Sequence, residues 1–247
     1  MLEVDKMNHV RSRMPGCLLA AVVLAALPAS DAGAQNFRVS LAFDRGTPQG
    51  TLAENVAGPL YGFSIAFAAR PWRVPLEVGT RLGFHFYGSD SFPVPLSAPF
   101  SNVFVNASTY QGHITTHLVA RTQPTSGRVQ PYLEAAFGLT HMFCTTSLEA
   151  DHADEAIAGV THEADSVVGG GVSGGVEITL VEGSAEGRHG GHPRLSLDAS
   201  VRRFWSGRAR YVKEGSLATP EAFERPLEIQ TSPFDLLNFS FGLAFRF

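Results

Sequence analysis

Apolar and polar residues alternate over the last twelve residues of the chain, "LLNFSFGLAFRF" (236–247). Every second position from Leu237 to Phe247 is Leu or Phe, while the positions between them carry small or polar side chains and Arg246. A period of two places the two sets of side chains on opposite sides of an extended backbone. The pattern therefore predicts a β-strand with one apolar face and one polar face.

Seven earlier segments alternate in the same way, and each is bounded by Gly, Pro, Asn or Asp residues that favour turns. They span 36–44, 60–69, 76–87, 109–121, 131–143, 167–180 and 194–205. The connections after the first, third, fifth and seventh segments are long, and the others are shorter. An even number of strands of about ten residues with connections alternating in length is typical of bacterial outer-membrane barrels. We therefore expect an all-β fold, an eight-stranded antiparallel up-and-down transmembrane β-barrel with long extracellular loops and short periplasmic turns.

The beginning of the chain predicts export. Arg11 and Arg13 precede a short apolar run, and Ala32 and Ala34 have the spacing of a signal-peptidase site,. The apolar core of about eleven residues is shorter than the roughly twenty that a spanning helix needs. Residues 1–34 are thus predicted to be a cleavable Sec-type signal peptide, with Met1, Met7 or Met14 as the start, and 35–247 to be the barrel domain.

Composition narrows the function classes. The net charge is only −4, and no basic block interleaves with aromatic residues, which argues against a nucleic-acid partner,. One of the two cysteines, Cys144, follows the predicted signal, so no internal disulfide is expected,.

The polar faces of the predicted strands carry charged and imidazole side chains among Gly, Ala and Ser. The interior of an eight-stranded barrel is just wide enough for side chains to fill, and charges drawn together there need partners. We expect a structural network of ion pairs and hydrogen bonds in the lumen, made by Arg38, Glu77, Arg81, His113, His117, Arg121, Glu134, Glu177, Asp198, Arg202 and Arg246. The glycines of 169–175 are expected to leave room for long Arg side chains. A soluble β-sandwich is the alternative, with the same charges on its solvated surface.

These features together resemble the small eight-stranded outer-membrane β-barrel proteins of Gram-negative bacteria, the OmpA/OmpX/OmpW-like class. The resemblance rests on the export signal, the eight alternating segments, the Gly-rich sixth segment and the terminal "FSFGLAFRF". It implies a place in the cell outer membrane, contact with outer-membrane lipid and lipopolysaccharide, and recognition by the barrel-assembly machinery during biogenesis. The assembly signal of that class falls here on Phe239, Phe241, Leu243, Phe245 and Phe247.

Three functions remain open at this point. The first is a structural or envelope-interaction role, with a lumen plugged by charged side chains and without cofactor or catalysis. The second is OmpW-like passage of small apolar molecules, for which the third connection supplies Phe92, Val94, Pro95, Leu96, Phe100 and Phe104. The third is a lipid-modifying enzyme, but the His-x-Ser pair of lipid A deacylases is missing, and 44–59 contains no His as the palmitoyltransferases require. Trp72 and Trp205 are expected at the membrane boundaries.

Metal sites are not predicted. His113 and His117 share a strand face but lie about 13 Å apart, too far to bind one ion directly. The acidic segment 147–166 lacks the ligand spacing of a calcium loop and is expected to be a solvated loop. Its members are Glu149, Asp151, His152, Asp154, Glu155, His162, Glu163 and Asp165, and a second His pair, His189 and His192, lies in a Gly-rich turn.

Overall fold

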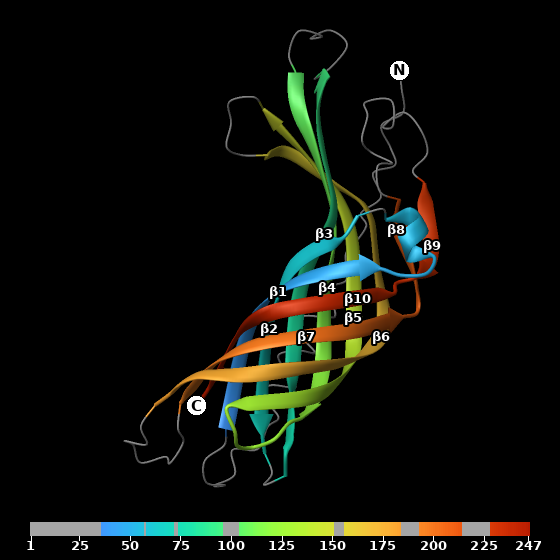
Figure 1. Ribbon diagram of the computed structural model, residues 1–247. Coiled ribbons are helices and arrows are strands. Elements are labelled where there is room, and N and C mark those ends of the chain that lie inside the picture. The colour runs from blue at the N-terminus through green and yellow to red at the C-terminus, as the bar shows by residue number, and fades with distance from the viewer. Residues whose placement is uncertain are drawn as a thin grey trace. The chain divides into compact units, whose positions relative to one another are not determined.

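Eight antiparallel strands close into one barrel (Figure 1). The computed structural model describes residues 36–56, 58–71, 74–95, 104–150, 156–183, 193–213 and 228–247. The barrel strands are β1 Asn36–Pro48, β2 Leu60–Arg70, β3 Leu76–Pro95, β4 Phe104–Thr122, β5 Val129–Ala150, β6 Ala156–Glu182, β7 Arg194–Ser206 and β10 Leu236–Arg246. The predicted barrel is confirmed, and a two-sheet sandwich is excluded for the described residues.

The last strand closes the barrel against the first. In the β1–β10 ladder Val39 lies opposite Phe245 and Phe43 opposite Phe241. At the end of this ladder Phe37 N donates to Phe247 O at 2.9 Å, and Phe247 N donates to Phe37 O at 3.0 Å. Closure removes the unpaired edge that an open sheet would present.

The outward faces of the strands form a belt of exposed apolar side chains. Soluble proteins rarely expose a contiguous apolar surface of this extent, whereas transmembrane barrels carry such a band around their circumference. The belt includes Leu41, Phe43, Phe63, Phe84, Leu118, Leu133, Phe137, Val172, Val201, Phe241 and Leu243, each more than two-fifths exposed. The five residues expected to form the assembly signal lie in this belt.

Four strands run on beyond the belt. The β3–β4 ladder continues to Pro95 opposite Phe104, and the β5–β6 ladder to Glu149 opposite Ala156. The expectation of a solvated loop over 147–166 was therefore wrong for its described residues, which are strand. The outward face changes character there: Ser91 Oγ lies 3.2 Å from Ser108 Oγ in place of Phe and Leu. Such a polar sequence carries no apolar period, so only continuation of the hydrogen-bond ladder reveals the strand.

A small insert lies at the same end of the barrel. It consists of helix α2 (Leu52–Asn55) between β1 and β2, and of a hairpin of β8 (Arg208–Val212) and β9 (Ile229–Pro233) between β7 and β10. Asn55 Nδ2 donates to Tyr211 Oη at 3.0 Å, which joins the helix to the hairpin. The helix is a single turn, and no helix among the described residues has the length and apolarity to cross a membrane.

The insert and the barrel end share one buried apolar cluster. It contains Leu52, Val56, Leu60, Tyr87, Met142, Val167, Phe204, Ala209, Tyr211, Phe234 and Leu236. We call it the apolar cap. It brings together the helix, the hairpin and the inward-facing residues of the strand ends.

Candidate functional site

The eleven residues predicted for the lumen network are all buried on the inward strand faces, with at most 7% of their surface exposed. Nine of them take part in ion pairs. His113 and His117 form none with the described residues, and each packs against an aromatic ring. The strand period explains the placement, because each of these residues shares its strand face with other buried positions.

The ion pairs in the lumen form two layers along the barrel axis. Glu134 on β5 lies at the centre, or hub, of one of them, which we call the inner tier. Its carboxylate accepts hydrogen bonds from Arg81 at 2.9 and 3.1 Å and from Arg121 at 2.8 and 3.0 Å. Arg202 of β7 approaches the same carboxylate to 3.4 Å. Arg121 is the direct cross-strand neighbour of Glu134, whereas the other two guanidinium groups come from strands that do not pair with β5. One carboxylate thus meets three guanidinium groups across the barrel interior.

A second tier lies nearer the short turns. Here Glu177 and Asp198 are direct cross-strand neighbours of like charge, an arrangement that is unfavourable by itself,. Arg38 from β1 offsets this repulsion, because its Nε lies 3.1 Å from Glu177 Oε2 and its Nη2 lies 2.5 Å from Asp198 Oδ2. In the same tier Arg246 Nη2 lies 3.0 Å from Glu77 Oε1.

Two members of this tier were missed in the sequence. Arg70 lies one residue beyond the predicted second strand, and its Nη2 donates to Glu77 Oε1 at 2.7 Å. Tyr132 donates to Asp198 Oδ1 at 2.6 Å, and the Arg121 guanidinium lies 3.6 Å above its ring. The available signal was the strand period, since Tyr132 shares the inward face with Glu134.

The glycines of β6 do not serve the arginines as expected. A Cβ on Gly175 would lie 2.5 Å from Tyr132 Cζ, and one on Gly169 would lie 2.7 Å from Phe204 Cζ. The space left by these two glycines is therefore occupied by aromatic rings. The sequence did not indicate that aromatic rings would fill this space, because each ring comes from a neighbouring strand.

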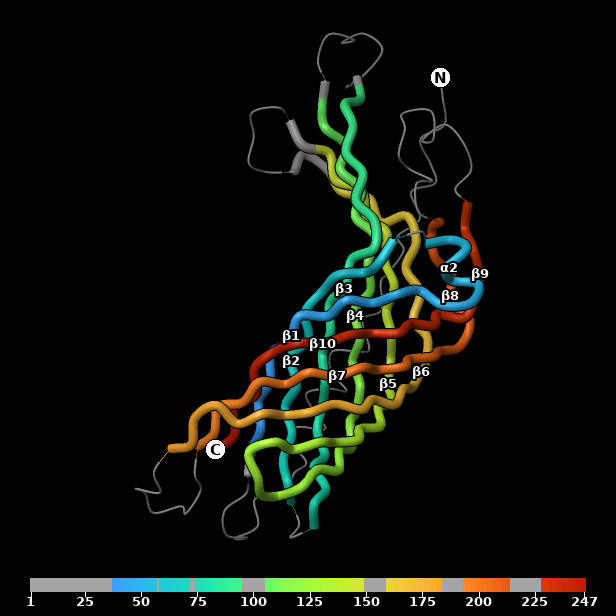
Figure 2. The backbone as a smooth tube through the Cα atoms, viewed as in Figure 1, coloured from blue at the N-terminus to red at the C-terminus, as the bar shows by residue number. Residues whose placement is uncertain are grey.

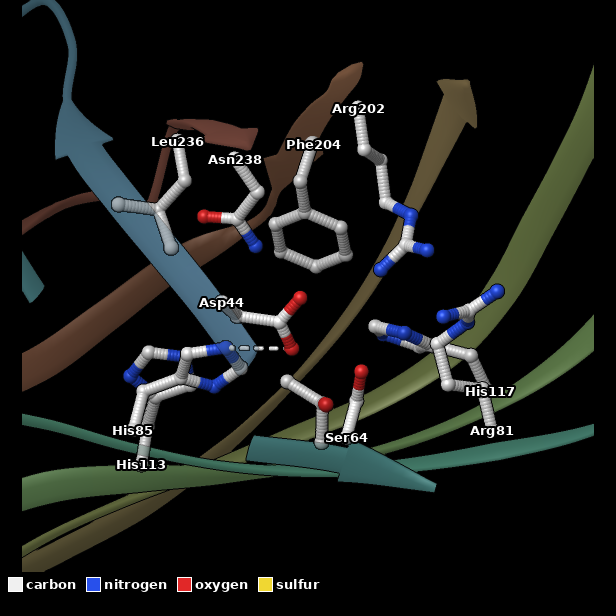
Figure 3. A pocket seen from close by; sticks show the side chains of 11 residues that line it. Asp44, Ser64, Arg81, His85, His113, His117, Arg202, Phe204, Leu236 and Asn238 are labelled. Carbon is white, nitrogen blue, oxygen red and sulfur yellow. Dashed lines mark ion pairs between the residues drawn. The ribbon is translucent and has the colours of Figure 1, made fainter. Parts of the chain in front are cut away.

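A third group of polar side chains surrounds a small cavity between the inner charge tier and the apolar cap (Figure 3). Asp44 Oδ2 lies 3.4 Å from His85 Nε2, and the other oxygen of Asp44 accepts a hydrogen bond from Ser240 Oγ. His85 stacks on its cross-strand neighbour His113 with ring centroids 4.6 Å apart. Asp44 and His85 each share a strand face with predicted network members, so the period could have included them.

The cavity is lined mostly by polar residues, with Phe204 and Leu236 on one side, and has room for about one water molecule. Its volume is about 10 Å³, at the lower limit for holding a water,. Ser64 Oγ, Arg81 Nε and Arg202 Nε have no hydrogen-bond partner in the described part of the chain. Buried polar atoms of this kind are ordinarily satisfied by ordered water. No group of three His, Cys, Asp or Glu residues in the described ranges has an arrangement suited to a metal ion.

The apolar cap lies directly against the histidines. Phe234, fully buried, makes an edge contact with His113 at 4.7 Å between ring centroids, and Phe204 lies 5.0 Å from His117. The segment that contains Phe234 was expected to be only a long connection between the last two strands. The sequence pattern could not indicate that Phe234 packs into the interior, because the segment has no regular period.

The other candidate residues lie apart from this interior. Phe92 is buried on the extension of β3 and Trp205 is exposed on β7, while Trp72, Leu96, Phe100, His189 and His192 fall outside the described residues. Asp165 Oδ2 accepts a hydrogen bond from Arg210 N at 2.8 Å, and Glu163 lies 3.6 Å from Arg210 Nε. These two acids therefore join β6 to β8 and are not part of a solvated loop; Asp151, His152, Asp154 and Glu155 are not described.

No protein-family model matches the chain, and no curated protein matches it. Several solved structures are similar to it, among them the following three. Neisserial surface protein A (NspA) is 14% identical, with 86% of this chain and 95% of that chain covered and a TM-score of 0.40. The N-terminal β-barrel domain of Pseudomonas aeruginosa OprF is 13% identical, with 87% and 100% covered and a TM-score of 0.36.

The third is Ail, the attachment invasion locus protein of Yersinia pestis, in complex with the heparin analogue sucrose octasulfate. It is 13% identical, with 87% of this chain and 99% of that chain covered and a TM-score of 0.35. At such identities and scores no activity or ligand transfers to this chain. What the chain's own strand order shows is the architecture, a closed eight-stranded antiparallel β-barrel.

Proposed function

We propose that the chain is an integral outer-membrane β-barrel protein with a structural or envelope-interaction role and no catalytic activity. The observation that carries the proposal is the inverted distribution of polarity, with an exposed apolar belt outside and buried ion pairs inside. Burying these charges inside the barrel while leaving Phe and Leu exposed is favourable only if the outer surface meets lipid. In this proposal residues 1–34 act as the export signal and the final strand as the assembly signal.

We further propose that the lumen is plugged. Two features support this: the guanidinium–carboxylate tiers span the interior between opposite strands, and the apolar cap packs across one end. An eight-stranded barrel has an interior that side chains can fill, so no wide water channel is required by the fold. Passage of small apolar molecules gains no support from the described cavity, because its volume of about 10 Å³ admits no more than about one water molecule,.

The first test is fractionation of the cell envelope combined with gel mobility of heated and unheated protein. A closed transmembrane barrel should be found in the outer-membrane fraction and should migrate as a compact species until it is boiled. Soluble periplasmic protein without a heat-dependent shift would contradict the membrane location. Planar-bilayer recordings on the same preparation should give no steady ionic conductance, whereas stable open channels would contradict the plugged lumen.

A further inference from the structure

Two arginines interrupt the apolar belt on the two strands that flank β10. Arg45 on β1 faces outward and is exposed, and Arg203 on β7 faces outward with a side chain 40% exposed. Both strands pair with β10, so the three run side by side (Figure 2). Between the two arginines the outward face of β10 stays apolar, with Leu237 and Phe239.

Both arginines lie near the margin of the belt. Each is eight residues along its strand from the first outward apolar residue, Phe37 on β1 and Leu195 on β7. Eight residues at about 3.3 Å per residue, on strands tilted by about 40°, correspond to about 20 Å along the barrel axis. An apolar band is about 25 Å tall in such barrels, so a side chain of this length at the margin reaches the headgroup layer.

The two side chains can converge on one group. Arg45 lies opposite Phe239, and Arg203 lies opposite Leu237, a step of two residues along β10. The two arginine strands are two inter-strand spacings, or about 10 Å, apart. With strands tilted by about 40°, crossing the two strand spacings from β1 to β7 changes the height along the barrel axis by about 6 Å. The shift of two residues in register restores about 5 Å of that height. The backbones are thus almost level, and the long side chains can meet above β10.

The charges there are available for an external partner. Arg45 has no hydrogen-bond or ion-pair partner among the residues that the structure describes. Arg203 has only a loose contact of 3.8 Å with Asp235. Exposed aromatic side chains flank the pair: Tyr61 lies opposite Arg45, and Trp205 follows Arg203 on the same face. Aromatic rings with a polar atom favour the membrane–water boundary.

We propose that Arg45 and Arg203 clamp the phosphate of a phosphorylated glycolipid of the outer leaflet, a molecule of the lipid A class, whose acyl chains pack on Phe239 and Phe241 of β10. This inference rests on the proposed outer-membrane location, with the long-connection end of the barrel facing outward. Guanidinium groups suit the site because they bind phosphate oxygens through two parallel hydrogen bonds. The glycolipid would form part of the barrel's immediate lipid shell.

Native mass spectrometry of the purified full barrel, released from detergent after incubation with bis-phosphorylated lipid A, tests the proposal. The wild type should retain lipid A, and Arg45→Gln and Arg203→Gln should each weaken retention by about fivefold, since a basic residue near an anionic surface contributes about 1 kcal/mol. The double variant should lose more than either single variant. Arg208→Gln is the matched control, because Arg208 is exposed on β8 and lies off the belt.

Three outcomes would overturn the clamp: equal retention by the double variant and the control, equal retention of dephosphorylated lipid A, or equal retention of phosphatidylglycerol. The last outcome would identify a general anionic lipid surface in place of a glycolipid site. The heat-dependent gel shift is measured on every variant, so that loss of the fold is recognised. If the wild type lacks that shift, the membrane-barrel proposal itself fails; if it has the shift but the variants bind normally, only the clamp fails.

Discussion

Replacing Glu134 with Gln should be among the most destabilising isosteric changes in this chain. The substitution keeps the size of the side chain and removes its negative charge. Three guanidinium groups, those of Arg81, Arg121 and Arg202, then lose the carboxylate that they share. Arg81 has no other ion-pair partner in the described residues, and arginine cannot release its proton to relieve the imbalance,.

The magnitude follows from burial. The Glu134 side chain is 1% exposed and the three arginine side chains are 2–6% exposed, so water screens the interaction little. Removing one partner of a buried pair costs about 3–5 kcal/mol. The matched control is Glu182→Gln, because Glu182 pairs with Arg194 at 3.2 Å but its side chain is 55% exposed. A surface pair of this kind contributes about 0–1 kcal/mol.

The assay is urea unfolding and refolding of the barrel in detergent micelles, followed by tryptophan fluorescence. Glu134→Gln should lower the free energy of unfolding by several kcal/mol more than Glu182→Gln does. The double variant Arg81→Gln with Glu134→Gln should be less destabilised than the sum of its two single variants, because one unpaired charge is removed together with its partner. Equal effects of the two Glu→Gln changes, or strict additivity in the double variant, would refute the account of the charge hub.

Two further predictions concern the packing around the hub. Gly175→Ala should destabilise by about 1–3 kcal/mol, because its new Cβ would lie 2.5 Å from Tyr132 Cζ,; the heat-dependent gel shift should move to lower temperature. Gly174→Ala, whose Cβ would meet only Leu133 Cδ2 at 3.7 Å on the outward face, is the control and should leave the shift in place. Phe234→Ala empties a fully buried site and should cost about 3–5 kcal/mol in the urea titration,. If the ion-pair tiers also block the lumen, planar bilayers should still show no steady conductance with this variant, and open channels would show that the cap alone closes it.

Much of the barrel could be predicted because its strands obey a single rule. The outward Phe, Leu and Val positions and the inward charged positions of all eight strands follow from a period of two. The same rule places Asp44 and His85 on the inward faces that carry Arg38 and Arg81, although neither residue was included in the predicted network. Local patterns failed where that period ends. The Ser- and Thr-bearing extensions of β3 to β6 and the hairpin of β8 and β9 have no apolar repeat, so they were expected to be loops.

Alternation alone predicts which side chains point outward, which point inward and that the barrel strands number eight, because it is a local property of an extended chain. The contacts between side chains in the lumen follow from the tertiary structure. Glu134 gathers arginines from three strands, Arg38 bridges two carboxylates on β6 and β7, and Phe234 packs on His113. These contacts depend on the stagger of the strands and on closure of β10 against β1. Register brings together residues that are far apart in the chain, 160 positions for Arg38 and Asp198 and 196 for Asp44 and Ser240,, and no local pattern encodes it.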